Sequence, residues 1–112
     1  MQNATRDTIL SIDTNKICRP VQVEYFGIVH IRAWTERQRQ NFVRLADKND
    51  GLELTLQIFI ASVIDEASGE PMFKQEDKTR IAELPAAAVE FVAHEAMRFN
   101  GMLDDEGDVK NG

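Results

Sequence analysis

The stretch that most constrains this chain is residues 52–65, LELTLQIFIASVID, its densest apolar run. On a helix, the apolar side chains of this run point in nearly all directions, so the helix would be central and covered on several sides. A strand is the alternative, because apolar and polar residues alternate from Leu52 to Ile58. That alternation fails at residues 58–61, which are all apolar, and the run is long for a strand. The sequence therefore predicts a central helix.

Length and charge narrow the class of protein. A chain of 112 residues suits one domain with one core, and a hydrophobic fraction of 43% is ordinary for a globular protein. The net charge of -6 argues against binding to nucleic acid, which requires clustered Lys and Arg. It suits a partner that is basic, or one that is apolar and must be kept soluble.

Several features indicate a cytosolic protein. The chain begins MQNATRDT, without the apolar segment of a secretory signal. Its longest apolar run is too short to span a bilayer, so we expect no membrane contact. Cys18 is the only cysteine, which excludes an internal disulfide.

Residues 21–34 have the pattern of a β-hairpin. Gly27 supplies a flexible backbone for the turn, and residues 28–31 resume a β-branched strand. One face of the first strand is expected to carry Val21, Val23 and Tyr25. His30 falls opposite the apolar face, so we expect a solvent-side residue rather than a metal ligand or catalytic group.

A helix is predicted to follow the hairpin. Thr35 and Gln38 fit a capping box, and turn residues end the helix at 48–51. The inward stripe is expected to consist of Phe42, Val43, Leu45 and Ala46. The chain has one basic cluster, expected to be a solvated face rather than an anion site, made of Arg32, Arg37, Arg39 and Arg44.

The second half of the chain continues with helical patterns. Residues 65–71 read as a polar turn and Met72–Phe73 as an apolar anchor, and residues 74–84 predict a short helix with Ile81 and Leu84 inward. Pro85 suits the start of a last helix, and Asn100–Gly101 suits its end. The apolar stripe of this helix is Ala88, Val89, Val92, Ala93, Ala96 and Phe99.

The expected fold is α+β and mainly helical, with an N-terminal β-hairpin followed by about four helices. Residues 17–103 would form the single globular domain. Residues 1–16 would be a flexible arm with one turn of helix at most, or an arm that orders on a partner or on a neighbouring copy. The acidic residues 104–112 are expected to be disordered.

No catalytic constellation is present in the sequence. A phosphate-cradling glycine loop and a Gly-x-Ser-x-Gly sequence are both absent, and Cys18 has no sign of being a nucleophile. The acidic segments that begin at Asp47 and Asp104 lack the glycine and glutamate positions of a calcium loop. His94–Glu95 does not begin a zinc-protease signature, because Arg98 stands where the second histidine would be. We therefore expect no enzyme, metal or cofactor.

Four short motifs occur in a characteristic order. They are Tyr25-Phe26-Gly27, then Val29-His30-Ile31-Arg32, then Val63-Ile64-Asp65-Glu66 with Gly69 and Met72-Phe73, and finally Arg98-Phe99-Asn100-Gly101-Met102. Over about residues 5–103, this order resembles the small tail assembly chaperones of long-tailed, siphovirus-like bacteriophages and prophages. The chain departs from that pattern at Trp34, at Leu84 and in the turn, where Trp-Gly-Gly is frequent.

The resemblance implies a non-enzymatic chaperone. Such proteins bind the tape measure protein, keep it assembly-competent while the tail tube forms, and then leave. They would act in the cytoplasm of the bacterial host and be absent from the mature virion. The major tail protein is a further possible partner, and self-association into a homo-oligomer is possible. The alternative is a structural tail-completion or tube-associated virion protein.

Two residue-level hypotheses follow from the resemblance. A partner-binding surface would use Trp34, Met97, Phe99 and Met102, because flexible Met contacts suit variable helical targets. The competing interpretation places these side chains in the core. A longer form made by ribosomal frameshifting is implied for many members, and codons for Lys110–Asn111 can form an A-rich slippery run. The coding DNA tests this second hypothesis.

Overall fold

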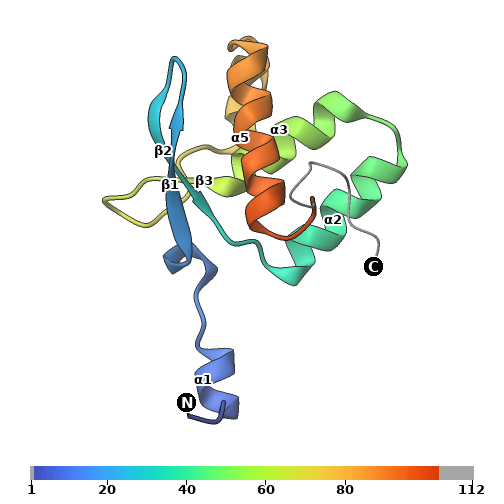
Figure 1. The fold of residues 1–112 in the computed structure, drawn as a ribbon. Helices are drawn as coiled ribbons and strands as arrows, with labels where there is room; N and C mark the ends of the chain where they lie inside the picture. The colour runs from blue at the N-terminus through green and yellow to red at the C-terminus, as the bar shows by residue number, and fades with distance from the viewer. Residues whose placement is uncertain (1, 104–112) are drawn as a thin grey trace.

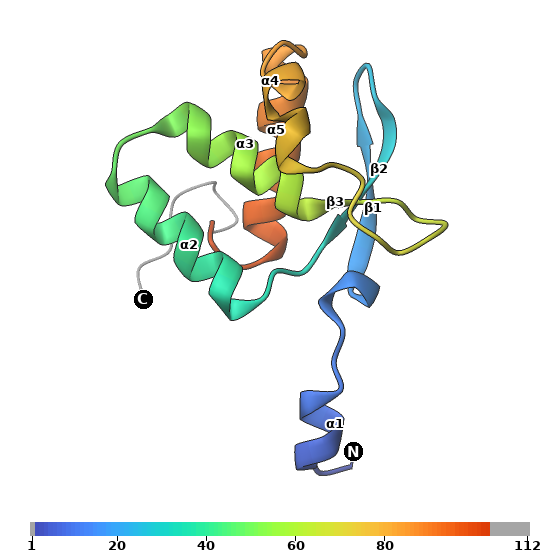
Figure 2. The same ribbon diagram turned by 180° about the vertical axis from the view of Figure 1, so that it is seen from behind.

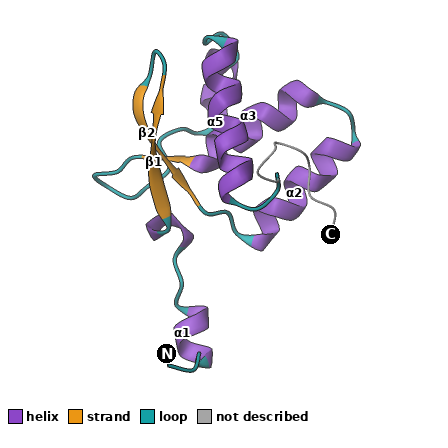
Figure 3. Ribbon diagram, viewed as in Figure 1, coloured by secondary structure: helices purple, strands orange, loops and turns teal. Residues whose placement is uncertain are grey.

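A computed structural model describes residues 2–103 and shows a small sheet beside a group of helices (Figure 1, Figure 3). The helices are α1 (Arg6–Leu10), α2 (Glu36–Asp47), α3 (Gly51–Ser62), α4 (Lys78–Ile81) and α5 (Ala86–Phe99), with 3-10 turns η1 (Thr14–Lys16) and η2 (Gln75–Asp77). The strands are β1 (Cys18–Val23), β2 (Gly27–Arg32) and β3 (Val63–Ile64). The predicted α+β class, with a hairpin ahead of the helices, is confirmed. The expected acidic tail and the possible frameshift codons lie outside the described residues.

The predicted hairpin is confirmed, and its turn is specific. β1 and β2 pair antiparallel from Cys18 opposite Arg32 to Val23 opposite Gly27. Gly27 has a φ of +90° and Tyr25 a φ of +73°, values that allow the chain to reverse within three residues. The prediction that Tyr25 shares the face of Val23 is wrong, because the turn interrupts the alternation and leaves Tyr25 exposed.

The central apolar run forms a helix, as predicted, but the helix ends at Ser62. Val63 and Ile64 then become β3, which pairs antiparallel with β2 through His30 opposite Ile64 and Ile31 opposite Val63. Both residues are β-branched, and the open edge of β2 offers their backbone groups hydrogen-bond partners. The hairpin therefore becomes the three-stranded sheet β1-β2-β3.

The core lies around α3. This helix packs against α2 and α5, and α5 also contacts both strands of the hairpin, as Figure 1 shows. Leu56, Ile58, Phe59 and Ile60 are buried on different sides of α3, which confirms a covered central helix. Phe59 joins separate elements, because its ring lies 6.3 Å from that of Phe26 in the hairpin turn and 5.5 Å from that of Phe73.

The capping box of α2 is confirmed, but its inward stripe is narrower than predicted. Gln38 N donates to Thr35 Oγ1 at 3.2 Å, and Thr35 N donates to Gln38 Oε1 at 2.9 Å. Phe42 is the buried member of the stripe, Val43 and Leu45 are half-buried, and Ala46 is exposed. α2 lies at the edge of the helix group and packs on α3 along one side, so few of its positions are covered (Figure 1).

The predicted helix over 74–84 is wrong in extent. η2 and the single turn of α4 replace it, because the side chain of Asp77 accepts a hydrogen bond from Lys74 N at 2.9 Å and closes a tighter turn. Ile81 is buried as predicted, whereas Leu84 and Met72 are exposed. A helix of one turn can point only one side chain, that of Ile81, into the core, so the apolar residues on either side of it stay at the surface.

The last helix agrees closely with its sequence pattern. Ala88, Val89, Val92, Ala93 and Ala96 are buried, and Phe99 is half-buried. The helix ends at Asn100, and Gly101 has the left-handed φ of +72° that favours glycine.

Candidate partner-binding surface

Trp34, one of the predicted partner-binding residues, lies in the core. It is 7% exposed, and its ring meets that of Phe42 edge-on at a centroid distance of 4.7 Å. Its indole Nε1 donates to Ser62 Oγ at 2.8 Å, a bond that is itself buried. Trp34 therefore ties the start of α2 to the end of α3.

The other three predicted residues gather around the end of α5. Met102 is buried, and Met97 and Phe99 are half-buried. The guanidinium of Arg19 covers Phe99 at 5.2 Å from the ring centroid and pairs with Glu95 at 2.8 Å. The structure brings the predicted residues together but leaves little of their apolar surface free, and their role in binding stays a prediction.

A polar network at this end of the molecule was not predicted. Asn100 Oδ1 accepts from the backbone N of Trp34 at 2.7 Å. Its Nδ2 donates to the carbonyl of Ala96 at 2.9 Å and to that of Arg32 at 3.3 Å. One amide side chain thus joins the end of α5 to the chain between β2 and α2, which lies 66 residues away in sequence. No local pattern signals such a contact.

Arg32 is buried at 6% exposure, so the prediction that it belongs to a solvated basic face is wrong. Its Nε donates to the carbonyl of Ala61 at 2.7 Å and its Nη1 to Thr14 Oγ1 at 3.1 Å. Burial lowers the pKa of Arg32, and the nearby charge of Asp13 opposes that shift. The reason is tertiary, because η1 and the end of α3 cover the side chain.

A trough opens away from the end of α5. It lies between α4, the start of α3 and the start of α5. Its aliphatic lining is Leu52, Leu56, Ile81, Leu84 and Val89, and its volume is about 380 Å³. A second hollow of about 500 Å³ shares Ile81 and Leu84 and extends the trough to Phe73. Leu52 is 63% exposed and Leu84 is 39% exposed, so this apolar surface is available to a partner.

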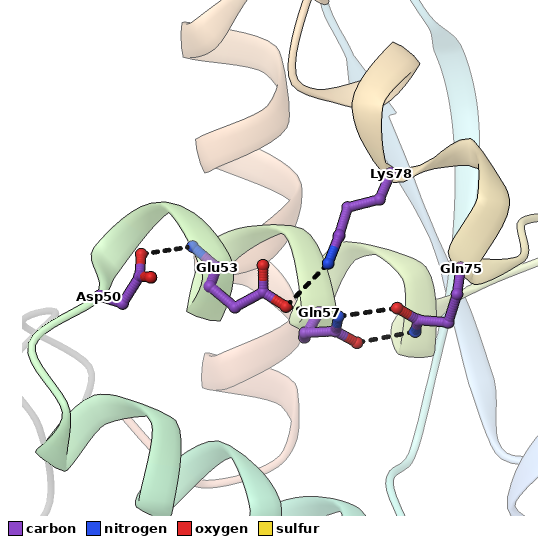
Figure 4. Close-up of polar contacts among 5 residues, drawn as sticks. All are labelled: Asp50, Glu53, Gln57, Gln75 and Lys78. Carbon is purple, nitrogen blue, oxygen red and sulfur yellow. Dashed lines mark hydrogen bonds and ion pairs between the residues drawn. The ribbon is translucent and has the colours of Figure 1, made fainter.

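A polar clasp holds the wall of the trough in place (Figure 4). Glu53 pairs with Lys78 at 3.1 Å, and the amides of Gln57 and Gln75 exchange two hydrogen bonds at 2.8 and 2.7 Å. Asp50 caps α3 by accepting from Glu53 N at 3.1 Å. The clasp positions η2 and α4 over α3, and its residues come from two distant segments.

The sequence matches no family model and no curated protein. The fold does have a counterpart among solved structures, the tail assembly chaperone of bacteriophage HK97. The two superpose with a TM-score of 0.61, over 80% of this chain and 92% of that chain, at 15% sequence identity. This chain has the fold of a phage tail assembly chaperone. At this identity the likeness is one of fold.

Three of the four motifs that carried the resemblance place a glycine at a bend of this fold. Gly27 begins β2 directly after the hairpin turn, Gly69 has a φ of +72° in the turn after β3, and Gly101 follows α5. Asp65 closes the second of these turns by accepting from Ala67 N at 2.9 Å and Ser68 N at 3.1 Å. These three motifs therefore mark where the chain reverses, whereas Val29-His30-Ile31-Arg32 lies within β2.

Among residues 2–103, no group of three or more His, Cys, Asp or Glu side chains is placed to hold a metal ion. Within the same residues, no helix has the length and apolar character needed to cross a membrane.

The clasp should make stability depend on pH in the acid range. Hydrogen bonds from Gln57 and then from Lys78 lower the pKa of Glu53. A carboxyl group whose pKa is lowered by folding stabilises the fold above its unfolded pKa of about 4.3, and that contribution is lost as the pH falls through the folded pKa. Urea unfolding should show Glu53→Gln less stable than wild type at pH 7, by less than about 1 kcal/mol because the pair is partly exposed.

That difference should shrink as the pH falls below the unfolded pKa of about 4.3, and it should vanish once the pH is below the lowered pKa of the folded Glu53. Glu36→Gln is the matched control, because the Glu36 carboxylate on α2 is bonded to the Gln40 amide at 2.8 Å rather than to a cation. A destabilisation by Glu53→Gln that is the same at pH 3 and pH 7 would contradict the assignment.

Proposed function

We propose that this protein is a tail assembly chaperone that binds the tape measure protein and keeps it soluble until the tail tube forms around it. The fold shared with the HK97 tail assembly chaperone is the observation that carries the proposal. The protein would act in the cytoplasm of the bacterial host and leave before the virion is complete. No reaction is required of it, because its task is reversible contact.

The trough supplies a surface suited to that task. An amphipathic helix docks through apolar side chains one turn apart, and the trough offers aliphatic contacts from three elements. The charged residues lining the trough and its extension are mostly acidic, with Asp77, Glu83 and Glu90 against Arg80. With the net charge of -6, this favours a client helix that has basic residues beside its apolar stripe.

The first test is co-expression of the tape measure protein with the Leu52→Asp and Leu84→Asp double variant. Leu52 and Leu84 are 63% and 39% exposed, so together they can bury about the area of one leucine, which contributes about 1.5–3 kcal/mol. Losing both contacts should therefore weaken co-purification at least about tenfold. Both side chains are exposed before binding, so thermal unfolding monitored by circular dichroism should be close to that of wild type.

Ile28→Asp is the matched control for the trough. Ile28 is 64% exposed and is as apolar as Leu52. It is the neighbour of the core-facing Val29 in β2, so its side chain lies on the face of the sheet that points away from the core. Ile28→Asp should bind the tape measure protein like wild type. Equal binding by the trough variant and wild type would exclude the trough as the client site.

Mass spectrometry of purified particles tests the role independently of the site. A chaperone should be missing from the mature particle, whereas stoichiometric recovery would identify a structural tail component instead.

A further inference from the structure

Arg32 carries a buried charge that no carboxylate neutralises within the described part of the chain. Its side chain is 6% exposed, and no Asp or Glu among the described residues lies within ion-pair distance of its guanidinium. The charge of Asp13 acts on it from beyond that distance. Its hydrogen-bond partners are neutral, namely the carbonyls of Ala61 and Ala33 and the hydroxyl of Thr14. Buried charges in proteins are normally paired, so Arg32 suits a negatively charged ligand.

A small cavity lies beside this side chain, between α2, the end of α3 and the segment that leads from β3 to η2. Figure 2 shows these elements from the side opposite to α5, with that segment close to the end of α3. The cavity has a volume of about 280 Å³ and is lined by Arg32, with apolar walls from Phe42, Ile60 and Phe73. We call it the Arg32 cavity. Its other polar lining consists of side-chain amides, and no described residue that lines it is acidic.

The groups that stay available in the Arg32 cavity are hydrogen-bond donors. The amides of Gln57 and Gln75 bond to each other, as Figure 4 shows. The capping box of α2 occupies Oε1 of Gln38, whereas Nε2 of Gln38 and Nδ2 of Asn41 bond to no other described residue. Nη2 of Arg32 also bonds to none of them, and it is not sealed from solvent. β2 and α2 therefore supply three donor groups, one of them charged.

We propose that the Arg32 cavity binds the carboxylate of an Asp or Glu side chain from a protein segment. The carboxylate accepts hydrogen bonds from the guanidinium of Arg32 and from the amides of Gln38 and Asn41, and its methylene groups rest on the apolar walls. A phosphate group suits the cavity less well. Its charge of about −1.5 to −2 would meet a single cation, in a protein whose net charge is -6.

The carboxylate can come from a second molecule or from the chain itself. Four acidic residues follow the last described residue, Leu103, and they are Asp104, Asp105, Glu106 and Asp108. Both sources present the same chemical group to the Arg32 cavity. A small probe therefore tests the site, and variants of the four acidic residues identify the source.

Sodium acetate is the probe, added to the full wild-type chain at constant ionic strength. NMR should show a saturable shift of the Arg32 Nε–H signal, because the carboxylate binds to the guanidinium whose Nε is fixed at 2.7 Å from the carbonyl of Ala61. The side-chain amide signals of Gln38 and Asn41 should shift with it. A dissociation constant on the order of 10 mM is expected for one charge-assisted pair. Sodium chloride should cause no such shift, and sodium phosphate should bind more weakly than acetate.

Asn41→Asp tests the site without disturbing the core. It places a carboxylate at the Arg32 cavity, so acetate should bind at least about tenfold more weakly. Asn41 is exposed, so the variant should unfold thermally like wild type. Asn3→Asp is the matched control, because Asn3 is exposed on the N-terminal arm and does not line the cavity. It should bind acetate like wild type. Arg32→Met removes the cation and should abolish the shifts of Gln38 and Asn41.

An amide variant of the full chain identifies the source of the carboxylate. It combines Asp104→Asn, Asp105→Asn, Glu106→Gln and Asp108→Asn. If the chain's own acidic residues occupy the Arg32 cavity, this variant should bind acetate about threefold more tightly than wild type, because the intramolecular competitor is gone. Equal binding by the two proteins would assign the cavity to a second molecule.

Four results would overturn the proposal. They are the absence of a saturable shift in both wild type and the amide variant, an equal response to chloride, tighter binding of phosphate than of acetate, and acetate binding by Asn41→Asp that equals that of wild type. None of these measurements uses the tape measure protein, so their failure would leave the proposed chaperone function standing.

Discussion

Replacing Trp34 with alanine should lower the free energy of unfolding by about 3–5 kcal/mol, the usual cost of removing a buried aromatic side chain. The ring is 7% exposed and packs on Phe42, so its loss leaves a cavity between α2 and α3. Urea unfolding followed by circular dichroism measures the change without relying on the fluorescence of the chain's single tryptophan.

Trp34→Phe is the graded control. It retains much of the apolar contact but leaves the Ser62 hydroxyl without the indole donor, so a cost of about 1–3 kcal/mol is expected from the unpaired buried group. If Trp34 contacted a partner from the surface, its replacement would change stability by less than about 0.5 kcal/mol. A stable Trp34→Ala protein that has lost its client would therefore support the binding role over the core position.

Asn100→Ala should destabilise the protein by about 2–4 kcal/mol, because it leaves partly buried backbone groups in two segments without their hydrogen-bond partner. Trp34 N loses its acceptor, and the carbonyls of Arg32 and Ala96 lose a donor. The chain between β2 and α2 and the end of α5 are then joined by apolar contacts alone. Urea unfolding at neutral pH measures this change too.

Asn41→Ala is the matched control for Asn100. Asn41 lies on the exposed side of α2, where its Oδ1 accepts a long 3.5 Å bond from Arg44, so the same substitution there should alter stability by less than about 0.5 kcal/mol. Equal effects at the two positions would show that the network around Asn100 contributes nothing beyond an ordinary surface contact.

The features that the sequence determined are local ones. Thr35 and Gln38 lie three residues apart and cap α2, Gly101 takes a left-handed φ after α5, and the stripe from Ala88 to Ala96 recurs at helical spacing. Each depends on the conformational preferences of residues within one or two turns of each other, so the printed order of residues is sufficient to predict it.

The tertiary structure decided everything that joins distant segments. Val63 and Ile64 became a strand because the edge of β2 was free, Arg32 was buried because η1 and the end of α3 close over it, and Leu84 stayed exposed because α4 is one turn long. Whether a side chain is covered depends on which surfaces meet, and those surfaces lie tens of residues apart in the chain. The same physical reason places the trough beyond sequence reasoning, since it is a gap between elements.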